Sequence, residues 1–168
     1  MISAVLQREL RTKVCLGCSG EGVISGSEEI ETAAAMTVWV ASLPDVKLTP
    51  VQLSVSHLQD QIRMSGWPDP GLEKSTFLLL ADPFSTPMQE VLSLMNDRYP
   101  HGSAGGGLAG GGQDSGENRL LLNDQDFDGG VVGVQLTGPI SVRTVTSQGC
   151  RPIGERFVVT RAEQNLIY

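Results

Sequence analysis

The chain has 168 residues, 40% hydrophobic and 18% charged, which suits one folded domain with its own core and excludes a disordered protein. Nineteen acidic and twelve basic side chains give a net charge of −7 without any Lys or Arg cluster, which argues against a DNA- or RNA-binding surface. The longest apolar runs are shorter than the ~18 residues of a membrane-spanning helix and no signal-peptide pattern is present, so we expect a soluble, cytoplasmic protein.

The first predicted element is a helix over residues 2–10. Its apolar side chains recur at helical spacing near one face: Ile2, Val5, Leu6 and Leu10. Domains of mixed type usually supply a strand ahead of such a helix. We therefore expect the chain to be a fragment of a longer domain that lacks its opening strand.

A strand, "KVCLGCS", follows at 13–19 and contains the C-x-x-C pair Cys15 and Cys18. A thioredoxin-like redox site would open a helix after the strand, which this run does not do. A zinc site needs two further ligands, and the candidates are scattered: Cys150, His57 and His101. An odd number of cysteines also favours a reducing compartment over a disulfide framework. We expect neither a metal nor a cofactor.

After a polar loop at 20–31, two apolar segments predict a pair of strands, "AAAMTVWVASLP" at 33–44 and "LTPVQLSV" at 48–55. Pro44 and Asp45 between them are typical of a hairpin connection, so this part of the sheet should be antiparallel. The next segment, 57–71, ends in the helix breakers "WPDPG" and is predicted to be a connecting loop.

A buried strand is predicted at 75–83, "STFLLLADP", followed by an amphipathic helix at about 86–97. Ser85 or Thr86 would cap this helix and Pro87 would occupy its first position. The side chains expected to face inward are Met88, Val91, Leu92 and Met95. Asp82 stands where the strand gives way to the helix, a place that often faces a ligand but that also suits a turn-forming aspartate.

Residues 101–116, "HGSAGGGLAGGGQDSG", form a glycine-rich tract that we predict to be a flexible loop. No Lys follows the glycines as a P-loop requires, and the element before them is helical rather than a strand. Downstream, three strands are predicted at 118–123, 129–138 and 140–149. Two short strands around a turn at 162–165 complete the chain.

Two glycines bracket a cysteine, an arginine and a proline in "QGCRPIG". Gly149 and Gly154 accept the positive φ angles of tight turns, while Pro152 fixes its own φ and favours an extended Arg151. The sequence therefore predicts a rigid loop, which either caps neighbouring strands or holds a ligand.

Four stretches together resemble the FIST domain, a sensory domain of bacteria and of some eukaryotic F-box proteins. They are "GCSGEGVI" (17–24), "ADPF" (81–84), "GGVVGVQLTGPISV" (129–142) and "QGCRPIGERFVVTRAEQNLIY" (148–168). The last is the most specific, and the resemblance to the N-terminal FIST subdomain covers nearly the whole chain. It implies a single sensory domain over 1–168 that binds small ligands such as amino acids and is not a catalyst.

The resemblance also implies missing parts. The family pattern has a strand before the first helix, and it continues beyond Tyr168 into a C-terminal subdomain. The glycine tract is longer here than the corresponding family loop. We expect the partners to be an amino-acid-like small molecule and either an unseen signalling protein or a C-terminal FIST subdomain.

If the ligand is an amino-acid-like anion, Arg151 is the natural carboxylate partner, because its planar guanidinium gives two charge-assisted hydrogen bonds. The candidate ligand-binding residues are Cys18, Ser19, Asp82, Gly149, Cys150, Arg151 and Gly154. The alternative is that Arg151 caps carbonyl groups or pairs with Glu155 or Asp82, and that Cys150 is a small apolar filler.

Two other classes of function remain open. A cysteine-dependent enzyme would use Cys150, with a pKa lowered by Arg151, and a histidine base, but no orienting carboxylate is recognisable by spacing. An interaction scaffold, as in the F-box proteins, would expose apolar side chains near Trp39, Trp67 or Phe84. We expect Trp39 in the core and Trp67 to be partly exposed.

The predicted architecture is α+β, a largely antiparallel mixed sheet with two main helices packed on it. The predicted core segments are 14–16, 36–40, 51–55, 77–80, 131–136 and 157–159. Without its first strand the sheet has an unpaired edge, which favours self-association.

Overall fold

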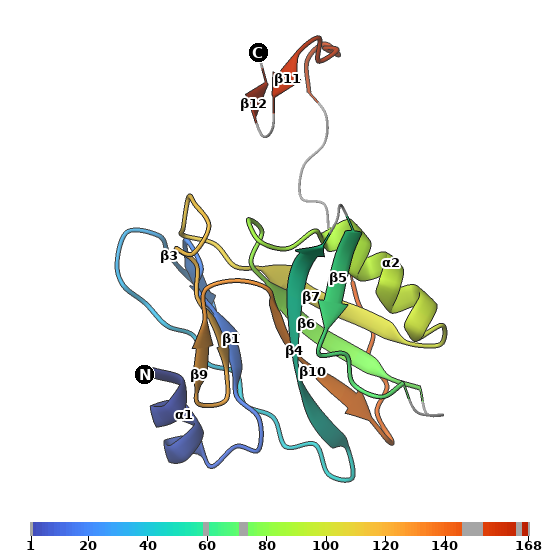
Figure 1. Cartoon of the computed structure of the whole chain (residues 1–168). Coiled ribbons are helices and arrows are strands. Elements are labelled where there is room, and N and C mark those ends of the chain that lie inside the picture. The colour runs from blue at the N-terminus through green and yellow to red at the C-terminus, as the bar shows by residue number, and fades with distance from the viewer. Residues whose placement is uncertain (1, 59–60, 71–73, 146–152, 164–165, 168) are drawn as a thin grey trace.

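The computed structural model describes residues 2–58, 61–70, 74–145, 153–163 and 166–167 (Figure 1). The helices are α1 (Ile2–Leu10) and α2 (Met88–Arg98). The strands are β1 (Leu16–Cys18), β2 (Val23–Ser25), β3 (Glu28–Ile30), β4 (Lys47–Leu58), β5 (Gln61–Ser65), β6 (Thr76–Ala81), β7 (Ser103–Leu108), β8 (Leu120–Leu122), β9 (Gln125–Phe127), β10 (Val131–Thr137), β11 (Ala162–Glu163) and β12 (Leu166–Ile167). No helix of this described part is long and apolar enough to cross a membrane.

The main sheet has the strand order β5-β4-β10-β6-β7. Its central strand, β10, pairs antiparallel with β4 on one side and with β6 on the other, so that Val131 lies between Leu53 and Ala81. The β6–β7 pair is parallel. The predicted α+β fold with a largely antiparallel sheet is therefore confirmed.

One face of the main sheet is covered by α2 (Figure 1). Side chains on this face form the first core cluster: Val51, Leu53, Phe77, Leu79, Ala81, Val91, Met95, Tyr99 and Val131. Val91 and Met95 reach it from α2, as their helical spacing predicts, whereas Leu92 is exposed. Deletion of one such fully buried aliphatic side chain typically costs 2–5 kcal/mol, so this cluster fixes the position of α2.

A second core cluster lies where the small sheet β1-β8-β9 meets the main sheet. Its buried members are Ala109, Leu120, Leu122 and Val132, with Val14, Leu16, Cys18, Leu80 and Phe127 packed against them. Val131 and Val132 belong to different clusters because successive side chains of a strand point to opposite faces. The strand predictions near 16, 77–80, 120 and 131–136 are confirmed.

The helix predicted at 2–10 forms, but its apolar side chains are not packed inward. Ile2, Val5 and Leu10 are exposed. The helix contacts the β8–β9 hairpin through polar groups, since the Ser3 hydroxyl donates to Asp126 Oδ1 at 3.1 Å. The apolar side chains that share one face of this helix therefore do not form a buried face at these three positions.

The strand predicted at 33–44 is absent, and segment 31–42 is exposed without regular structure. Trp39, expected in the core, is 83% exposed. The hairpin partner of β4 is instead β5, which lies in the segment predicted to be a loop, and the 20–31 loop contains the β2–β3 hairpin. Alternating apolar residues do not make a strand unless a sheet edge receives them.

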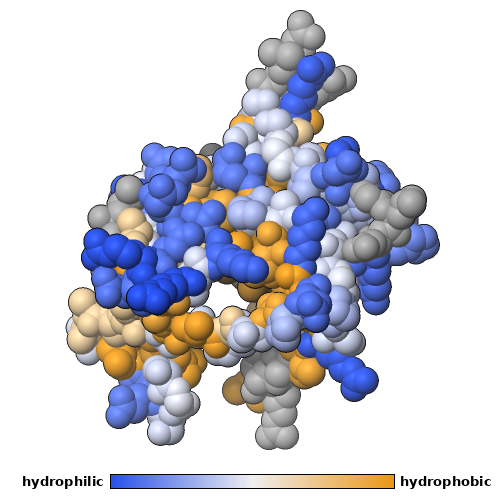
Figure 2. Space-filling model, turned by 90° about the horizontal axis from the view of Figure 1, so that it is seen from below, coloured by the Kyte–Doolittle hydropathy of each residue, from blue (hydrophilic) through white to orange (hydrophobic). Residues whose placement is uncertain are grey.

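Hydrophobic groups are visible at the surface in the view from below, beside an opening (Figure 2). The exposed large hydrophobic side chains of the first forty residues are Ile2, Val5, Leu10, Ile24, Met36, Val38, Trp39 and Val40. Much of the apolar surface of the first forty residues is therefore left in contact with solvent.

The glycine tract predicted to be a flexible loop contains the edge strand β7 over 103–108. The physical reason is a close backbone approach. A Cβ at Gly106 would lie 1.8 Å from the Leu79 carbonyl oxygen, so the parallel pairing with β6 requires glycine there.

The C-terminal segment also departs from prediction. Residues 141–145 and 155–161 have no regular structure, and the expected core residues Phe157, Val158 and Val159 are exposed, Phe157 by 90%. The β11–β12 hairpin lies apart from the main body in Figure 1. In the described part of the chain, residues 155–161 neither pair with a sheet edge nor pack into a core cluster.

Candidate functional site

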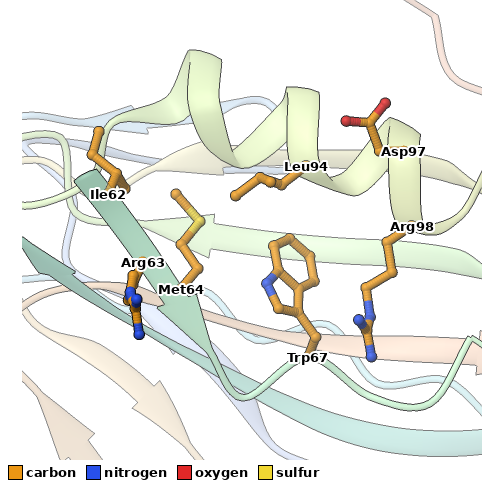
Figure 3. Close-up of a pocket in the computed structure, with 7 residues that line it drawn as sticks. All are labelled: Ile62, Arg63, Met64, Trp67, Leu94, Asp97 and Arg98. Carbon is orange, nitrogen blue, oxygen red and sulfur yellow. The ribbon is translucent and has the colours of Figure 1, made fainter.

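A pocket of about 500 Å³ lies between β5, the turn that follows it and the second half of α2. Its apolar lining is Ile62, Met64, Trp67 and Leu94, and its charged lining is Arg63, Asp97 and Arg98 (Figure 3). We call it the β5–α2 pocket. Binding sites for small molecules are typically concavities of ~300–1,000 Å³ with an apolar lining and a few polar groups.

The position of Trp67 in this pocket is fixed by its neighbours. Gly66 has φ +93°, and a Cβ there would lie 1.9 Å from the Gln52 carbonyl oxygen, so only glycine allows the chain to turn back here. The Trp67 ring packs on Tyr99, with 6.1 Å between the ring centroids. The Tyr99 hydroxyl donates a hydrogen bond to the Pro68 carbonyl oxygen at 2.5 Å. The indole is therefore held in one place before any ligand arrives.

Met64, Trp67 and Leu94 point toward one another in Figure 3 and form the apolar wall. Met64 reaches the wall because side chains alternate along β5, where it pairs with Val55 of β4. Arg63, between Ile62 and Met64, points away from α2 in the same view.

The charged side chains differ in their relation to Trp67. Arg98, the last residue of α2, runs alongside the Trp67 ring in Figure 3. Burial raises the pKa of the Tyr99 hydroxyl, although a hydrogen bond from Arg98 acts in the opposite direction. Asp97 extends from the other side of the helix, away from Trp67. The side of the pocket next to the indole therefore carries a guanidinium group.

Asp82, a residue predicted for the site, lies elsewhere, beyond the end of β6, where its side chain is fully buried in a polar network. Its Oδ2 accepts hydrogen bonds from the Ser85 amide at 2.8 Å and the Ser85 hydroxyl at 2.6 Å, and its Oδ1 accepts one from Asn118 Nδ2 at 2.9 Å. Burial alone would raise the pKa of the Asp82 carboxyl, but these hydrogen bonds outweigh it and hold the pKa below its usual value. At neutral pH the carboxylate is therefore ionised, and both of its oxygens accept hydrogen bonds.

The same network fixes the start of α2. Ser85 Oγ accepts a hydrogen bond from the Gly130 amide at 2.9 Å, and Thr86 Oγ1 donates to the Gly130 carbonyl oxygen at 2.9 Å. Neither hydroxyl caps the helix, and Pro87 stands at the cap position rather than the first helical one. The predicted capping role of Ser85 or Thr86 is therefore replaced by attachment to β10.

Ser19 joins the network through Asn118, which is fully buried. Asn118 Oδ1 accepts from the Gly112 amide at 3.0 Å and from the Ser19 hydroxyl at 3.5 Å. Ser19 Oγ in turn accepts from the Arg119 amide at 3.1 Å. Three of the quoted sequence stretches, at 17–24, 81–84 and 129–142, thus converge at one end of the two sheets.

The structure brings Ser19 and Asp82 together but does not bring all predicted site residues together. Cys18 packs in the second core cluster, and burial raises the pKa of its thiol and that of Cys15. Gly149, Cys150 and Arg151 lie outside the described residues. Gly154 is exposed with φ +83°, as its predicted turn role requires.

Asp82 does not line the β5–α2 pocket, and its described partners satisfy its carboxylate. Through Ser85, Thr86 and Asn118, this network joins the end of β6 to β10 and to the segment before β8. Within the described ranges, no group of three or more His, Cys, Asp or Glu side chains could hold a metal ion.

Sequence reasoning missed the β5–α2 pocket. One signal was present, the alternation of Ile62 and Met64 around Arg63, which is typical of a strand. Trp67 was predicted to be partly exposed, and this is confirmed, because it is half-buried at the pocket wall.

Comparison with known proteins identifies relatives over the full chain. The family model of the FIST N domain matches residues 1–168. The uncharacterized protein Rv0628c of Mycobacterium tuberculosis (strain ATCC 25618 / H37Rv) is 33% identical over 164 residues, which is 98% of this chain and 42% of the relative. The uncharacterized protein Mb0898c of Mycobacterium bovis is 34% identical over 167 residues, 99% of this chain and 42% of the relative. The chain thus spans about two fifths of the length of these relatives. No solved structure matches it.

Proposed function

Because the chain belongs to the FIST N domain family, a family of sensory domains in signal transduction, we propose that it binds a small-molecule ligand and that the β5–α2 pocket is the binding site. The role is that of a non-catalytic module whose ligand-bound state is read by a partner. The partner is a signalling protein or a C-terminal FIST subdomain.

The preformed pocket is the observation that carries this proposal. Trp67 is held by Gly66 and Tyr99, so a ligand meets an aromatic wall that is already in place. A preorganised site lowers the entropic cost of binding, because fewer side chains have to be ordered when the ligand binds. An apolar wall next to the Arg98 guanidinium suits a ligand with both a carboxylate and a hydrophobic part.

The proposed ligand class is small carboxylates that also carry a hydrophobic part. Arg98 takes the role that the sequence analysis gave to Arg151. The two arginines offer the same chemistry, a planar guanidinium for a carboxylate, but only Arg98 lies in a described pocket.

The test is thermal denaturation of the chain against a panel of amino acids and small carboxylates. A ligand at ~100 times its Kd adds about 2.7 kcal/mol to the free energy of unfolding, which raises Tm by several degrees. The diagnostic variant is Leu94→Glu, which places a negative charge in the pocket. Its control is Leu92→Glu, because Leu92 lies on the same helix outside the pocket and is similarly exposed, 44% against 40% for Leu94.

We expect Leu92→Glu to keep the ligand-induced rise in Tm and Leu94→Glu to lose it. If no compound changes the Tm of a chain that melts cooperatively, the binding function is wrong. If both variants respond like the unmodified chain, a ligand binds elsewhere and the assigned pocket is wrong.

A protein-interaction scaffold is the second candidate function, favoured by the exposure of Trp39 in the uncharged segment 32–43. A surface tryptophan flanked by Val38 and Val40 has the composition of a protein contact. Under this alternative, Trp39→Ala abolishes binding to a defined partner without lowering Tm. The pocket variant Leu94→Glu would leave that binding unchanged.

A further inference from the structure

The apolar wall of the β5–α2 pocket suits a flat group. Trp67 uses one part of its ring against Tyr99, whose own ring is 4.7 Å from Phe77, so the stack is anchored in the core. Met64 and Leu94 face the indole from β5 and α2 (Figure 3). An aromatic ring placed here contacts both an indole and a thioether, two groups that pack well against aromatic rings.

A single anion partner stands beside this wall. The Arg98 guanidinium, which has five N–H donors, lies beside the Trp67 ring (Figure 3). A ligand whose ring packs on Trp67 can therefore place a carboxylate within reach of these donors. The lining contains no glycine and no helix N-terminus, the usual features of a phosphate site.

Among the described residues, the side of the pocket next to Trp67 offers no acidic partner for an ammonium group. Asp97, its one acidic lining residue, points away from Trp67. Asp69 is close enough to raise the pKa of Tyr99, but it does not line the pocket and is engaged in an interaction of its own. The ammonium group of an amino acid would lie close to its own carboxylate and therefore next to the like-charged Arg98 guanidinium, with no acidic side chain to offset the repulsion.

Resting on the proposed binding function, the geometry points to a narrower ligand class: aromatic monocarboxylates that carry no amino group. The ring lies against Trp67 and Met64, and the carboxylate accepts hydrogen bonds from Arg98. The absent acidic partner excludes zwitterionic amino acids from tight binding.

A matched set of three compounds tests this selectivity. L-phenylalanine is 3-phenylpropionate with an added amino group, and 3-phenylpropionamide replaces the carboxylate by a neutral amide. The full chain carries two tryptophans, so Trp39→Phe leaves Trp67 as the only indole reporter. Binding is followed by Trp67 fluorescence and by calorimetry on the same samples.

We expect 3-phenylpropionate to bind at least about tenfold more tightly than either analogue. Arg98→Ala should reduce the affinity for 3-phenylpropionate to that of the amide while leaving the weak affinity for the amide unchanged. Arg98→Gln, which retains a polar side chain of similar length, provides a second variant if the alanine variant unfolds.

Equal or tighter binding of L-phenylalanine overturns the selectivity but leaves the binding function intact. Equal binding of the amide overturns the role of Arg98. Heat of binding without a change in Trp67 fluorescence places the ligand elsewhere and overturns the inference. If none of these compounds and no member of the wider carboxylate panel binds, the proposed function fails as well.

Discussion

The Tyr99 hydroxyl donates a 2.5 Å hydrogen bond to the Pro68 carbonyl oxygen, which joins the end of α2 to the turn that carries Trp67. This contact connects two segments that are separated in sequence by β6 and α2. It makes one wall of the pocket depend on a single side chain outside the pocket lining.

Removal of this hydroxyl is the first prediction. Tyr99→Phe keeps the ring packing on Phe77 and Trp67 but leaves the Pro68 carbonyl without this donor, so the free energy of unfolding should fall by about 1 kcal/mol. Urea unfolding measures this loss, and ligand titration should show weaker binding because Trp67 is less firmly placed. Unchanged stability and unchanged affinity together would show that the hydrogen bond has no role in positioning.

The second prediction concerns pH and Asp82. The pKa of this carboxyl is lowered in the folded protein, so its stabilising contribution is complete above the unfolded-state pKa of about 4 and is lost as pH falls through the lower folded-state value. Asp82→Asn should cost about 2 kcal/mol near pH 7, because one of the two acceptor oxygens becomes an NH2 group that faces either the Ser85 N–H or the Asn118 amide, both of which are donors.

Thermal melts of both proteins between pH 7 and pH 2 measure this effect. The difference in stability should stay constant down to about pH 5 and shrink below pH 4. A difference that remains constant to pH 2 would contradict the assignment of an ionised, hydrogen-bonded Asp82.

A third prediction distinguishes two neighbouring glycines of β7. Gly106→Ala should destabilise the fold by about 3 kcal/mol or more, because the new Cβ would collide with the Leu79 carbonyl oxygen of the paired strand. Gly107→Ala is the matched control, since its Cβ would meet nothing within 4 Å. Chemical denaturation of both variants measures their free energies of unfolding. Equal losses of stability would mean that β7 does not pair with β6 at this register.

The two candidate carboxylate partners give a fourth prediction. Arg98→Ala should abolish the ligand-induced rise in Tm, whereas Arg151→Ala should preserve it. The opposite result would return the binding site to the loop at 149–154, which the sequence analysis proposed for its arginine and glycine donors. Both variants are to be compared in ligand-free melts first, so that a general loss of stability is not mistaken for a loss of binding.

Much of the sheet was predictable because several of its strands have an apolar pattern in their own sequence. β6 and β10 are short, nearly continuous apolar runs, and the α2 periodicity placed Val91 and Met95 correctly. Segment 36–40 has the same apolar character, yet it is exposed, because a strand needs an edge that its own sequence does not specify. The glycine tract was predicted to be a flexible loop, but part of it forms β7. The reason is the close approach of Gly106 to Leu79, which depends on both strands and cannot be seen in the glycine tract alone.

The candidate site was less predictable than the fold. Asp82 and Ser19 were selected from the sequence and do share a network, but Asn118, which joins them, carried no signal of its own. The β5–α2 pocket depends on Tyr99 meeting Pro68 across the fold, and no local pattern contains that contact.

The position of β10 at the centre of the main sheet has a consequence for the order of events during synthesis. β4 and β6 are made well before β10, but they are not neighbours in the sheet, and each pairs with β10 instead. A nascent chain that ends before Val131 therefore holds two strands whose shared partner has not yet left the ribosome. Sheet closure must wait for it, and during that interval two apolar strand edges are open to chaperones or to other nascent chains.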